Sequence, residues 1–341
     1  MHAPKDIEDL EDRLSLPTDE VLETLRAFPG DWLVLGVAGK MGPSMARMIQ
    51  RGLQKLGRTD RVYGVARFSQ PHAKEQLERW GIQAIPADLL QEGALEKLPS
   101  APHVLYLAGM KFGSTGQEPL TWAMNTWLPA MVGSRFRSSR IVALSTGNVY
   151  GLSPVEHGGS RETDPLNPVG EYAMSCLGRE RLLAYCSQTW NVPLALIRLN
   201  YACDLRYGVM VDLADKVTQG IPIDLSMGYF NTLWQGDANA LTIAAMNHTC
   251  TDPYVLNLTG PELLSVRETA ITLGETLSMV PCFQGSEAGS ALLSDSRKCL
   301  EHVGRPRIDA ATLLDWVVAW RKQGGARLGK PTHFESRQGK F

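Results

Sequence analysis

Between residues 32 and 199 the sequence alternates short apolar segments with stretches of helical periodicity. The apolar segments lie at 32–36, 61–66, 82–86, 103–108, 140–145 and 194–199. The helical stretches lie at 43–56, 74–80, 120–136 and 172–189. Short buried strands separated by helices indicate parallel strands that are joined by crossover connections. The sequence therefore predicts an α/β fold with a doubly wound parallel sheet.

Composition excludes several classes of protein. The chain has 341 residues, 44% of them hydrophobic, and a formal net charge of −2. Since this charge cannot supply many phosphate contacts, we expect no nucleic-acid partner. No apolar run approaches about 20 residues and the acidic start lacks the apolar core of a leader peptide, so we expect no membrane segment and a cytoplasmic protein. The six cysteines show no metal-ligand spacing, which predicts free thiols and no metal.

A glycine-rich loop, Gly36-Val-Ala-Gly39-Lys-Met-Gly42, lies between the first predicted strand and the first predicted helix of this alternation. Glycines at such a junction allow a tight turn and let the backbone approach a pyrophosphate, which then sits at the helix N-terminus. We expect the backbone amides of Gly39, Lys40 and Met41 to bind the pyrophosphate of a dinucleotide cofactor.

Six further segments follow this loop. They are Ala87-Asp88-Leu89, Leu105–Gly109, Asn125, Ser145–Gly151, Arg198-Leu-Asn200 and Tyr254–Pro261. Their order and spacing resemble those of the extended short-chain dehydrogenase/reductase family, the NAD-dependent epimerases and dehydratases. The resemblance covers roughly residues 32–320. It implies a Rossmann domain with a smaller C-terminal substrate-binding domain.

The chain is expected to divide accordingly. Residues 1–31 are expected to form a helical extension, in which Thr18 begins a helix as its N-cap. The remaining parts are a Rossmann domain at 32–202 and 234–262, a substrate-binding domain at 203–233 and 263–324, and a polar, poorly ordered tail at 325–341.

The resemblance also implies a catalytic site. Tyr172 would transfer a proton to or from the substrate, and Thr146 would polarise the reacting oxygen. The residues implied in cofactor binding are Gly36, Gly39, Lys40, Met41, Gly42, Arg67, Asp88, Leu89, Leu107, Ala108, Gly109, Asn125, Tyr172, Cys176 and Asn200.

One residue departs from the family motif, because Cys176 replaces the lysine that follows the tyrosine by four positions. Positions i and i+4 share a helix face, so a lysine there would favour the phenolate of Tyr172. A thiol carries no positive charge and is a weak donor. Lys111 and Arg161 are candidate replacement cations, although an exposed loop position is the simpler interpretation of Lys111. His157 is a candidate substitute base, and a solvated loop histidine is its simpler interpretation.

Two further departures concern the ligands. Ala66, followed by Arg67, stands where an acidic residue would bind the adenosine ribose, and an arginine is able to pair with a 2′-phosphate. With Lys40 adding positive charge, this modestly favours NADP over NAD. Phe230 stands where the family places an arginine for the substrate diphosphate, ahead of an acidic residue aligned with Asp237. This indicates a free sugar, a sugar acid or another small polyol.

These observations predict an NAD(P)-dependent epimerase, dehydratase or reductase that acts on a sugar or nucleotide-sugar-like substrate by hydride transfer. The alternative is that the chain is a nucleotide-binding homologue without redox turnover that acts as a regulatory or partner subunit. Cys176 is the main sequence feature that supports this alternative. A small carbohydrate-like molecule is the expected partner, and the sequence leaves open whether the chain forms a homodimer.

Overall fold

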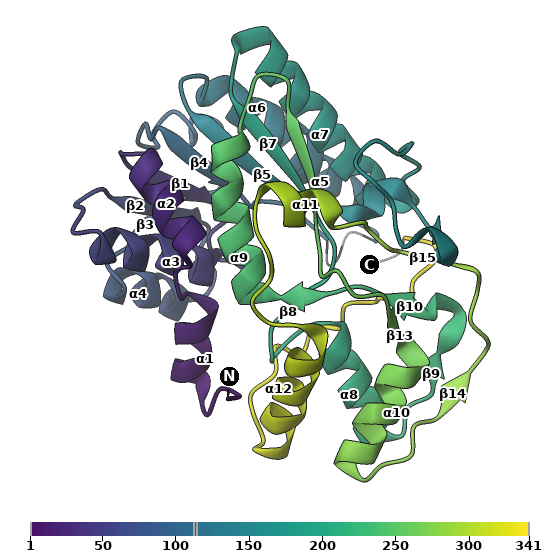
Figure 1. Cartoon of the computed structure of the whole chain (residues 1–341). Coiled ribbons are helices and arrows are strands. Elements are labelled where there is room, and N and C mark those ends of the chain that lie inside the picture. The colour runs from purple at the N-terminus through teal and green to yellow at the C-terminus, as the bar shows by residue number, and fades with distance from the viewer. Residues whose placement is uncertain (1, 112, 114, 340–341) are drawn as a thin grey trace.

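A seven-stranded sheet forms the centre of the computed structural model, which describes residues 2–111, 113 and 115–339 (Figure 1). In spatial order its strands are β12 (Tyr254–Leu258), β7 (Leu194–Leu199), β5 (Arg140–Thr146), β4 (His103–Tyr106), β1 (Trp32–Leu35), β2 (Val62–Ala66) and β3 (Gln83–Pro86). All neighbouring strands are parallel. The chain runs outward from β1 to β3 and returns to β4 on the other side of β1. The predicted doubly wound parallel sheet is confirmed.

The α-helices and the short strands surround this sheet. The helices are α1 (Ile7–Leu14), α2 (Asp19–Ala27), α3 (Gly42–Lys55), α4 (Pro71–Arg79), α5 (Glu118–Trp122), α6 (Leu128–Arg135), α7 (Gly170–Trp190), α8 (Val209–Gln219), α9 (Gln235–Ala244), α10 (Val266–Leu277), α11 (Arg297–His302) and α12 (Ala310–Lys322). The two-residue strands are β6 (Ser153–Pro154), β8 (Ala202–Cys203), β9 (Ile223–Asp224), β10 (Tyr229–Phe230), β11 (Leu233–Trp234), β13 (Leu264–Ser265), β14 (Phe283–Gln284) and β15 (Ser290–Ala291). None of the described helices is both long and apolar enough to pass through a lipid bilayer.

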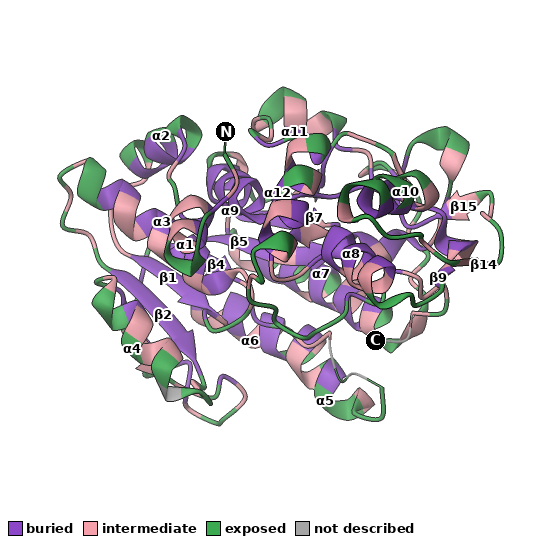
Figure 2. Ribbon diagram, turned by 90° about the horizontal axis from the view of Figure 1, so that it is seen from below, coloured by how far each residue is buried: buried purple, intermediate pink, exposed green. Residues whose placement is uncertain are grey.

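Helices cover both faces of the sheet. Trp32 and Val34 of β1 pack in one apolar cluster with residues of α2, α3 and α9. Leu33 and Leu35 point to the other face and pack with residues of α6 and α7. Figure 2 shows the buried strands between helices whose outer sides are exposed. Successive residues of a strand point to opposite faces of the sheet. Because helices cover both faces, the residues on both sides are apolar, which explains the continuous apolar segments of the sequence.

The N-terminal extension is part of the folded core. Thr18 caps α2 as predicted, since its side chain accepts a hydrogen bond from the amide of Val21. Val21 and Leu25 of α2 are fully buried against the sheet. A second helix, α1, precedes it, begins at the cap Asp6 and packs against α9 and α3.

A second apolar cluster lies beside the sheet and joins α8, α10 and α12. Within it, Trp234 and Trp316 meet edge to face, with ring centroids 5.3 Å apart. Figure 1 shows these helices together below the carboxyl end of the sheet. This arrangement is the smaller C-terminal region that the fold class predicts.

The predicted helix at 120–136 is interrupted. A π-helical turn (Ala123–Trp127) separates α5 from α6 and contains Asn125. Such turns widen a helix by one residue and occur frequently at functional sites. Here the turn accommodates a fully buried asparagine whose side chain bonds two neighbouring segments.

The expectation of a poorly ordered tail is wrong for residues 325–339. The ring of Phe334 is buried in the second apolar cluster. The amide and the hydroxyl of Thr332 both donate to a carboxylate oxygen of Asp212, at 2.7 and 2.6 Å. Glu335 pairs with Lys216 of α8. The segment is polar in composition, but one aromatic residue and a few specific bonds suffice to hold it.

This packing predicts that Phe334→Ala lowers the free energy of unfolding by about 3–5 kcal/mol, the usual cost of removing a buried ring. Urea denaturation followed by fluorescence measures the change. Tyr185→Ala is the matched control, because that ring is 60% exposed and its loss should cost less than about 0.5 kcal/mol. Equal stability of the two variants would show that the tail does not pack as described.

Candidate functional site

A cleft opens at the carboxyl ends of β1, β4, β5 and β7, where the strand order reverses. Crevices at this position bind ligands in open α/β sheets. The cleft has a larger compartment of about 640 Å³ and a smaller one of about 170 Å³. Residues that line both are Lys40, Met41, Lys111, Ser145, Tyr172 and Leu199. The two compartments therefore adjoin each other at Tyr172.

The glycine loop forms the floor of the larger compartment. Gly36 has a φ of 85°, and a Cβ there would lie 2.6 Å from the amide nitrogen of Ala108. A Cβ on Gly42 would lie 2.2 Å from the carbonyl oxygen of Val37, so this glycine is required for the turn into α3. A Cβ on Gly39 would meet only the carbonyl oxygen of Gly36, at 3.3 Å, and would point into otherwise open space.

The N-terminus of α3 is suited to a pyrophosphate. Its N-cap residue Met41 makes no side-chain capping bond, so the first-turn amides are not satisfied by a cap. Ser44 in this turn accepts a hydrogen bond from Asn239 of α9 at 2.9 Å, which fixes the helix start. These residues fit a dinucleotide cofactor in the larger compartment.

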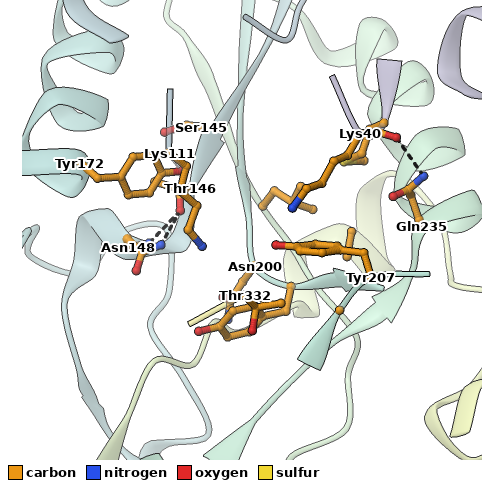
Figure 3. A pocket seen from close by; sticks show the side chains of 15 residues that line it. Lys40, Lys111, Ser145, Thr146, Asn148, Tyr172, Asn200, Tyr207, Gln235 and Thr332 are labelled. Atoms are coloured by element: carbon orange, nitrogen blue, oxygen red, sulfur yellow. Dashed lines mark hydrogen bonds between the residues drawn. The ribbon is translucent and has the colours of Figure 1, made fainter. Parts of the chain in front are cut away.

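Tyr172 and Thr146 meet at the junction of the two compartments. The phenol of Tyr172 is hydrogen-bonded to the side chains of Thr146 and Cys176. The Oγ1 of Thr146 also accepts from the amide and the Nδ2 of Asn148, at 3.2 and 2.9 Å. Figure 3 shows Tyr172 and Thr146 side by side on one wall of the smaller compartment. The pair that the motifs indicate is thus brought together by β5 and α7.

Burial raises the pKa of the Tyr172 phenol well above its ordinary value. The neighbouring Cys176 raises this pKa further, whereas Arg179 and the hydrogen bond with Thr146 lower it. Cys176 is fully buried in a small apolar cluster with Val149 and Tyr150, and burial raises the pKa of its thiol as well. Cys176 therefore contributes no positive charge beside the phenol.

Arg179 supplies a buried positive charge that the family motifs do not indicate. It is 6% exposed, lines the larger compartment and lowers the pKa of Tyr172. Its guanidinium donates to the carbonyl of Leu144 at 2.7 Å and to the Oδ1 of Asn125 at 2.8 Å. Arg179 follows Tyr172 by seven residues, two helical turns, which places both on one face of α7. Only this spacing could have revealed it in the sequence.

Two lysines also reach the cleft. The Nζ of Lys111 lies 5.8 Å from the centre of the Tyr172 ring, so the interpretation of Lys111 as an exposed loop lysine is wrong. The Nζ of Lys40 lies 3.0 Å from the centre of the Tyr207 ring. Burial is the main cause that lowers the pKa of Lys40 to about 6 and that of Lys111 to about 8.

The other expected site residues fall into three groups. Those that line the larger compartment are Gly36, Gly39, Lys40, Met41, Gly42, Leu107, Gly109 and Tyr172, and Asn200 lines the smaller one. Those that are buried behind the lining are Leu89, Ala108, Asn125 and Cys176. Those that are exposed and outside both linings are Arg67 and Asp88.

Four residues that the sequence analysis raised lie elsewhere. His157 is exposed beside Glu156, and Arg161 pairs with Asp295, so neither lines the cleft. Phe230 is fully buried in the second apolar cluster. Asp237 pairs with Arg307 at 2.7 Å and accepts two backbone amides, so its carboxylate has a structural partner.

Comparison with known proteins agrees with this geometry. The model of the NAD dependent epimerase/dehydratase family matches residues 32–202, half of the chain. The chain belongs to this family. The resemblance read from its motifs is therefore confirmed, and its Rossmann fold is that of the family. No match is found among curated protein sequences.

Several solved structures share the fold. MoeE5 in complex with UDP-glucuronic acid and NAD is 20% identical, with a TM-score of 0.70 over 86% of this chain and 100% of that one. UDP-glucuronic acid 4-epimerase from Bacillus cereus is 17% identical, with a TM-score of 0.70 over 86% and 99%. UDP-glucose 4-epimerase from Thermus thermophilus, in complex with NAD, is 20% identical, with a TM-score of 0.68 over 85% and 98%.

The glycine loop generates a direct prediction. Gly39→Val should abolish binding of NADH and NADPH, because the branched side chain would occupy the space of the pyrophosphate, while the stability of the protein changes little. Isothermal titration calorimetry measures the binding. Gly289→Val is the control, because that glycine has no neighbouring atom within 4 Å and lies outside both compartments. Unchanged binding by the Gly39 variant would remove the pyrophosphate from this loop.

Proposed function

We propose that this protein is an NAD(P)-dependent epimerase, dehydratase or reductase, and that it acts on a carbohydrate-like substrate by hydride transfer. The observation that carries this proposal is the hydrogen-bonded pair of Tyr172 and Thr146 at the junction of the two compartments. A group in the smaller compartment would be in reach of both hydroxyls and would face the larger compartment. The family membership and the NAD complexes of similar structures support the same assignment.

In this proposal, the glycine loop and the start of α3 hold the pyrophosphate, and Leu107 and Gly109 form the wall along the cofactor. The cofactor, when bound, supplies the hydride acceptor and donor. Thr146 donates its proton in a hydrogen bond to the reacting oxygen of the substrate. Tyr172 removes the hydroxyl proton when the substrate carbon is oxidised and returns a proton when the carbon is reduced.

Arg179 would perform part of the electrostatic role that a lysine at position 176 would have. A phenol with a raised pKa is a poor base near neutrality, so the phenolate needs a neighbouring cation. The buried guanidinium of Arg179 is the cation that lowers the pKa of Tyr172, and its place in the lining also allows contact with the cofactor. This keeps the enzyme interpretation consistent with the replacement of the lysine by Cys176.

The substrate would lie in the smaller compartment, between the Rossmann domain (32–202 and 234–262) and the substrate-binding domain (203–233 and 263–324). Tyr207 and Gly208 from the latter line this compartment, and so does Thr332 from the tail. Similar structures contain UDP-sugars. In the motif alignment, Phe230 replaces an arginine that would pair with a diphosphate. We propose a free sugar, a sugar acid or another small polyol on that alignment, since the ring itself is buried in the second apolar cluster and does not line the cleft.

A nucleotide-binding protein without redox turnover is the second candidate. Two observations favour it, namely the fully buried Cys176 in place of a lysine and the raised pKa of Tyr172. In that case the cofactor would bind and the phenol would remain protonated.

The two candidates differ in their response to changes at Tyr172. With a panel of sugars, sugar acids and polyols and oxidised cofactor, we expect conversion of a substrate by the parent and by Tyr185→Phe, and none by Tyr172→Phe. Sugar analysis detects an epimerised or dehydrated product, in which the hydride has returned to the substrate, and absorbance detects NADH or NADPH if the substrate is oxidised. Activity should rise with pH over the range where the phenolate forms. Arg179→Met should move this rise to higher pH by about one unit, and Cys176→Lys should move it to lower pH.

Controls separate charge from packing in this assay. Arg179→Lys keeps the positive charge, so the pH dependence of its activity should stay close to that of the parent. Cys176→Ala adds no charge, so its activity should not begin to rise at a lower pH than that of the parent. If Tyr172→Phe keeps full turnover, another group is the base. Tight nucleotide binding with no turnover on the whole panel would favour the second candidate.

We infer from Ala66 and Arg67 that the cofactor preference is for NADPH over NADH. Arg67→Ala should narrow the difference by up to about fivefold, since an exposed ion pair contributes little and is screened by salt. Both affinities are measured by calorimetry at one fixed, low salt concentration. Arg305→Ala, an exposed arginine outside both compartments, is the control. Equal affinities of the parent protein for the two cofactors would contradict the preference.

A further inference from the structure

Two lysines enter the smaller compartment from opposite walls. Lys40 comes from the glycine loop between β1 and α3, and Lys111 comes from the segment that follows β4. Figure 3 shows both side chains extending toward the middle of the compartment, where Tyr207, Asn200 and Thr332 lie. Among the described residues that line this compartment, two are lysines and none is an aspartate or glutamate.

The side chain of Lys40 lies away from the expected pyrophosphate site. Gly36, Gly39 and Gly42 line only the larger compartment, whereas Lys40 lines both. The ammonium of Lys40 lies over the ring of Tyr207, which belongs to the lining of the smaller compartment. The side chain of Lys40 therefore extends away from the glycines whose amides face the cofactor.

The ammonium groups of the pair repel each other, because other lysines lie near Lys40 and few carboxylates oppose them. Lys111 and Lys330 both lower the pKa of Lys40, in addition to its burial. The carboxylate that opposes these effects is Asp212, and it already accepts two hydrogen bonds from Thr332. Tyr172 and Cys176 lie against Lys111, and neither is anionic near neutrality because the pKa of each is raised. An anion between the two ammonium groups would relieve their repulsion and restore their charge.

We propose that the smaller compartment binds a carbohydrate-like ligand through an anionic group, a carboxylate or a phosphate, held between Lys40 and Lys111. The hydroxyl and amide groups of Thr146, Asn148, Asn200 and Gln235 line the same space and suit the hydroxyls of a sugar. This inference rests on the proposed function, because it takes the compartment beside Tyr172 as the substrate site. It adds that the substrate is a sugar acid or sugar phosphate and not a neutral sugar.

Binding of simple anions to NADH-saturated protein tests this inference. The probes are sulfate, glucuronate and glucose, none of which titrates between pH 6 and 8.5. We expect sulfate and glucuronate to bind in isothermal titration calorimetry, and glucose to bind at least about tenfold more weakly. Lys40→Gln and Lys111→Gln should each weaken binding of both anions by about tenfold, the usual effect of losing one charged hydrogen bond. Lys97→Gln, an exposed lysine outside both compartments, makes the same charge change and should bind like the parent.

The pH dependence adds a second measurement. Since the pKa of Lys40 is lowered to about 6 and that of Lys111 to about 8, an anion binds with uptake of protons. Affinity for sulfate should therefore rise as the pH falls from 8.5 to 6 in the parent, and this rise should be smaller in Lys40→Gln. NADH affinity of each variant shows whether the fold and the larger compartment are intact.

Three outcomes would overturn the inference. Glucuronate and sulfate could bind no better than glucose, or not at all. The two lysine variants could bind anions as tightly as Lys97→Gln does. Sulfate could bind only when NADH is absent, in which case the lysines serve the cofactor pyrophosphate. Because these measurements need no turnover, their failure is distinguishable from that of the proposed function, which depends on the Tyr172→Phe assay.

Discussion

The hydrogen bonds of Asn125 hold the walls of the cleft together. Its Oδ1 accepts from the amide of Met110 and from Arg179, both at 2.8 Å, and its Nδ2 donates to the carbonyl of Met110 at 2.8 Å and to Ser175 at 3.0 Å. One fully buried side chain thus joins the segment after β4 to α7. Lys111 follows Met110 directly, and Tyr172 lies in the first turn of the helix that contains Ser175 and Arg179. A buried amide that loses a hydrogen-bond partner destabilises the folded state. The π-helical turn that contains Asn125, the segment after β4 and helix α7 are therefore held in one arrangement.

A second buried network stands beside the first and differs from it in charge. Arg198 of β7 makes a two-pronged contact with Glu180 of α7, with distances of 2.7 and 3.1 Å, and also donates to the hydroxyl of Tyr150. Tyr150 in turn donates to Asn257 of β12. In this network the cation has a carboxylate partner. Arg179 is bonded to carbonyl and amide oxygens of Leu144 and Asn125, so its charge is less neutralised and acts on Tyr172.

The replacement of the motif lysine by Cys176 therefore does not leave the phenol without positive charge. Arg179 lies along the same helix face, and Lys111 lies over the Tyr172 ring from another segment. Both residues come from positions with no fixed relation to the motif: Arg179 lines the larger compartment, and Lys111 lines both compartments. Charge acts through space, so a site is able to retain its electrostatic character when one residue changes, provided that another element brings a cation near.

The sequence by itself determined the architecture of the sheet and the place of the cofactor loop, since both depend on local patterns. Apolar segments of strand length between helices admit few arrangements, and Gly42 is required where a Cβ would meet the carbonyl of Val37. The pairing of Thr146 with Tyr172 was implied by the resemblance of their motifs to those of the family; Thr146 ends β5, and Tyr172 lies in the first turn of α7. The tertiary structure decided what depends on contacts between distant segments. In the tertiary structure, the side chain of Lys111 points into the cleft and Arg179 lies behind Gly109. Phe334 of the tail is buried in the second apolar cluster, which includes residues of α8. The orientation of a long side chain from a loop and the docking of a polar segment leave no periodic trace in a sequence, because they depend on where other elements stand.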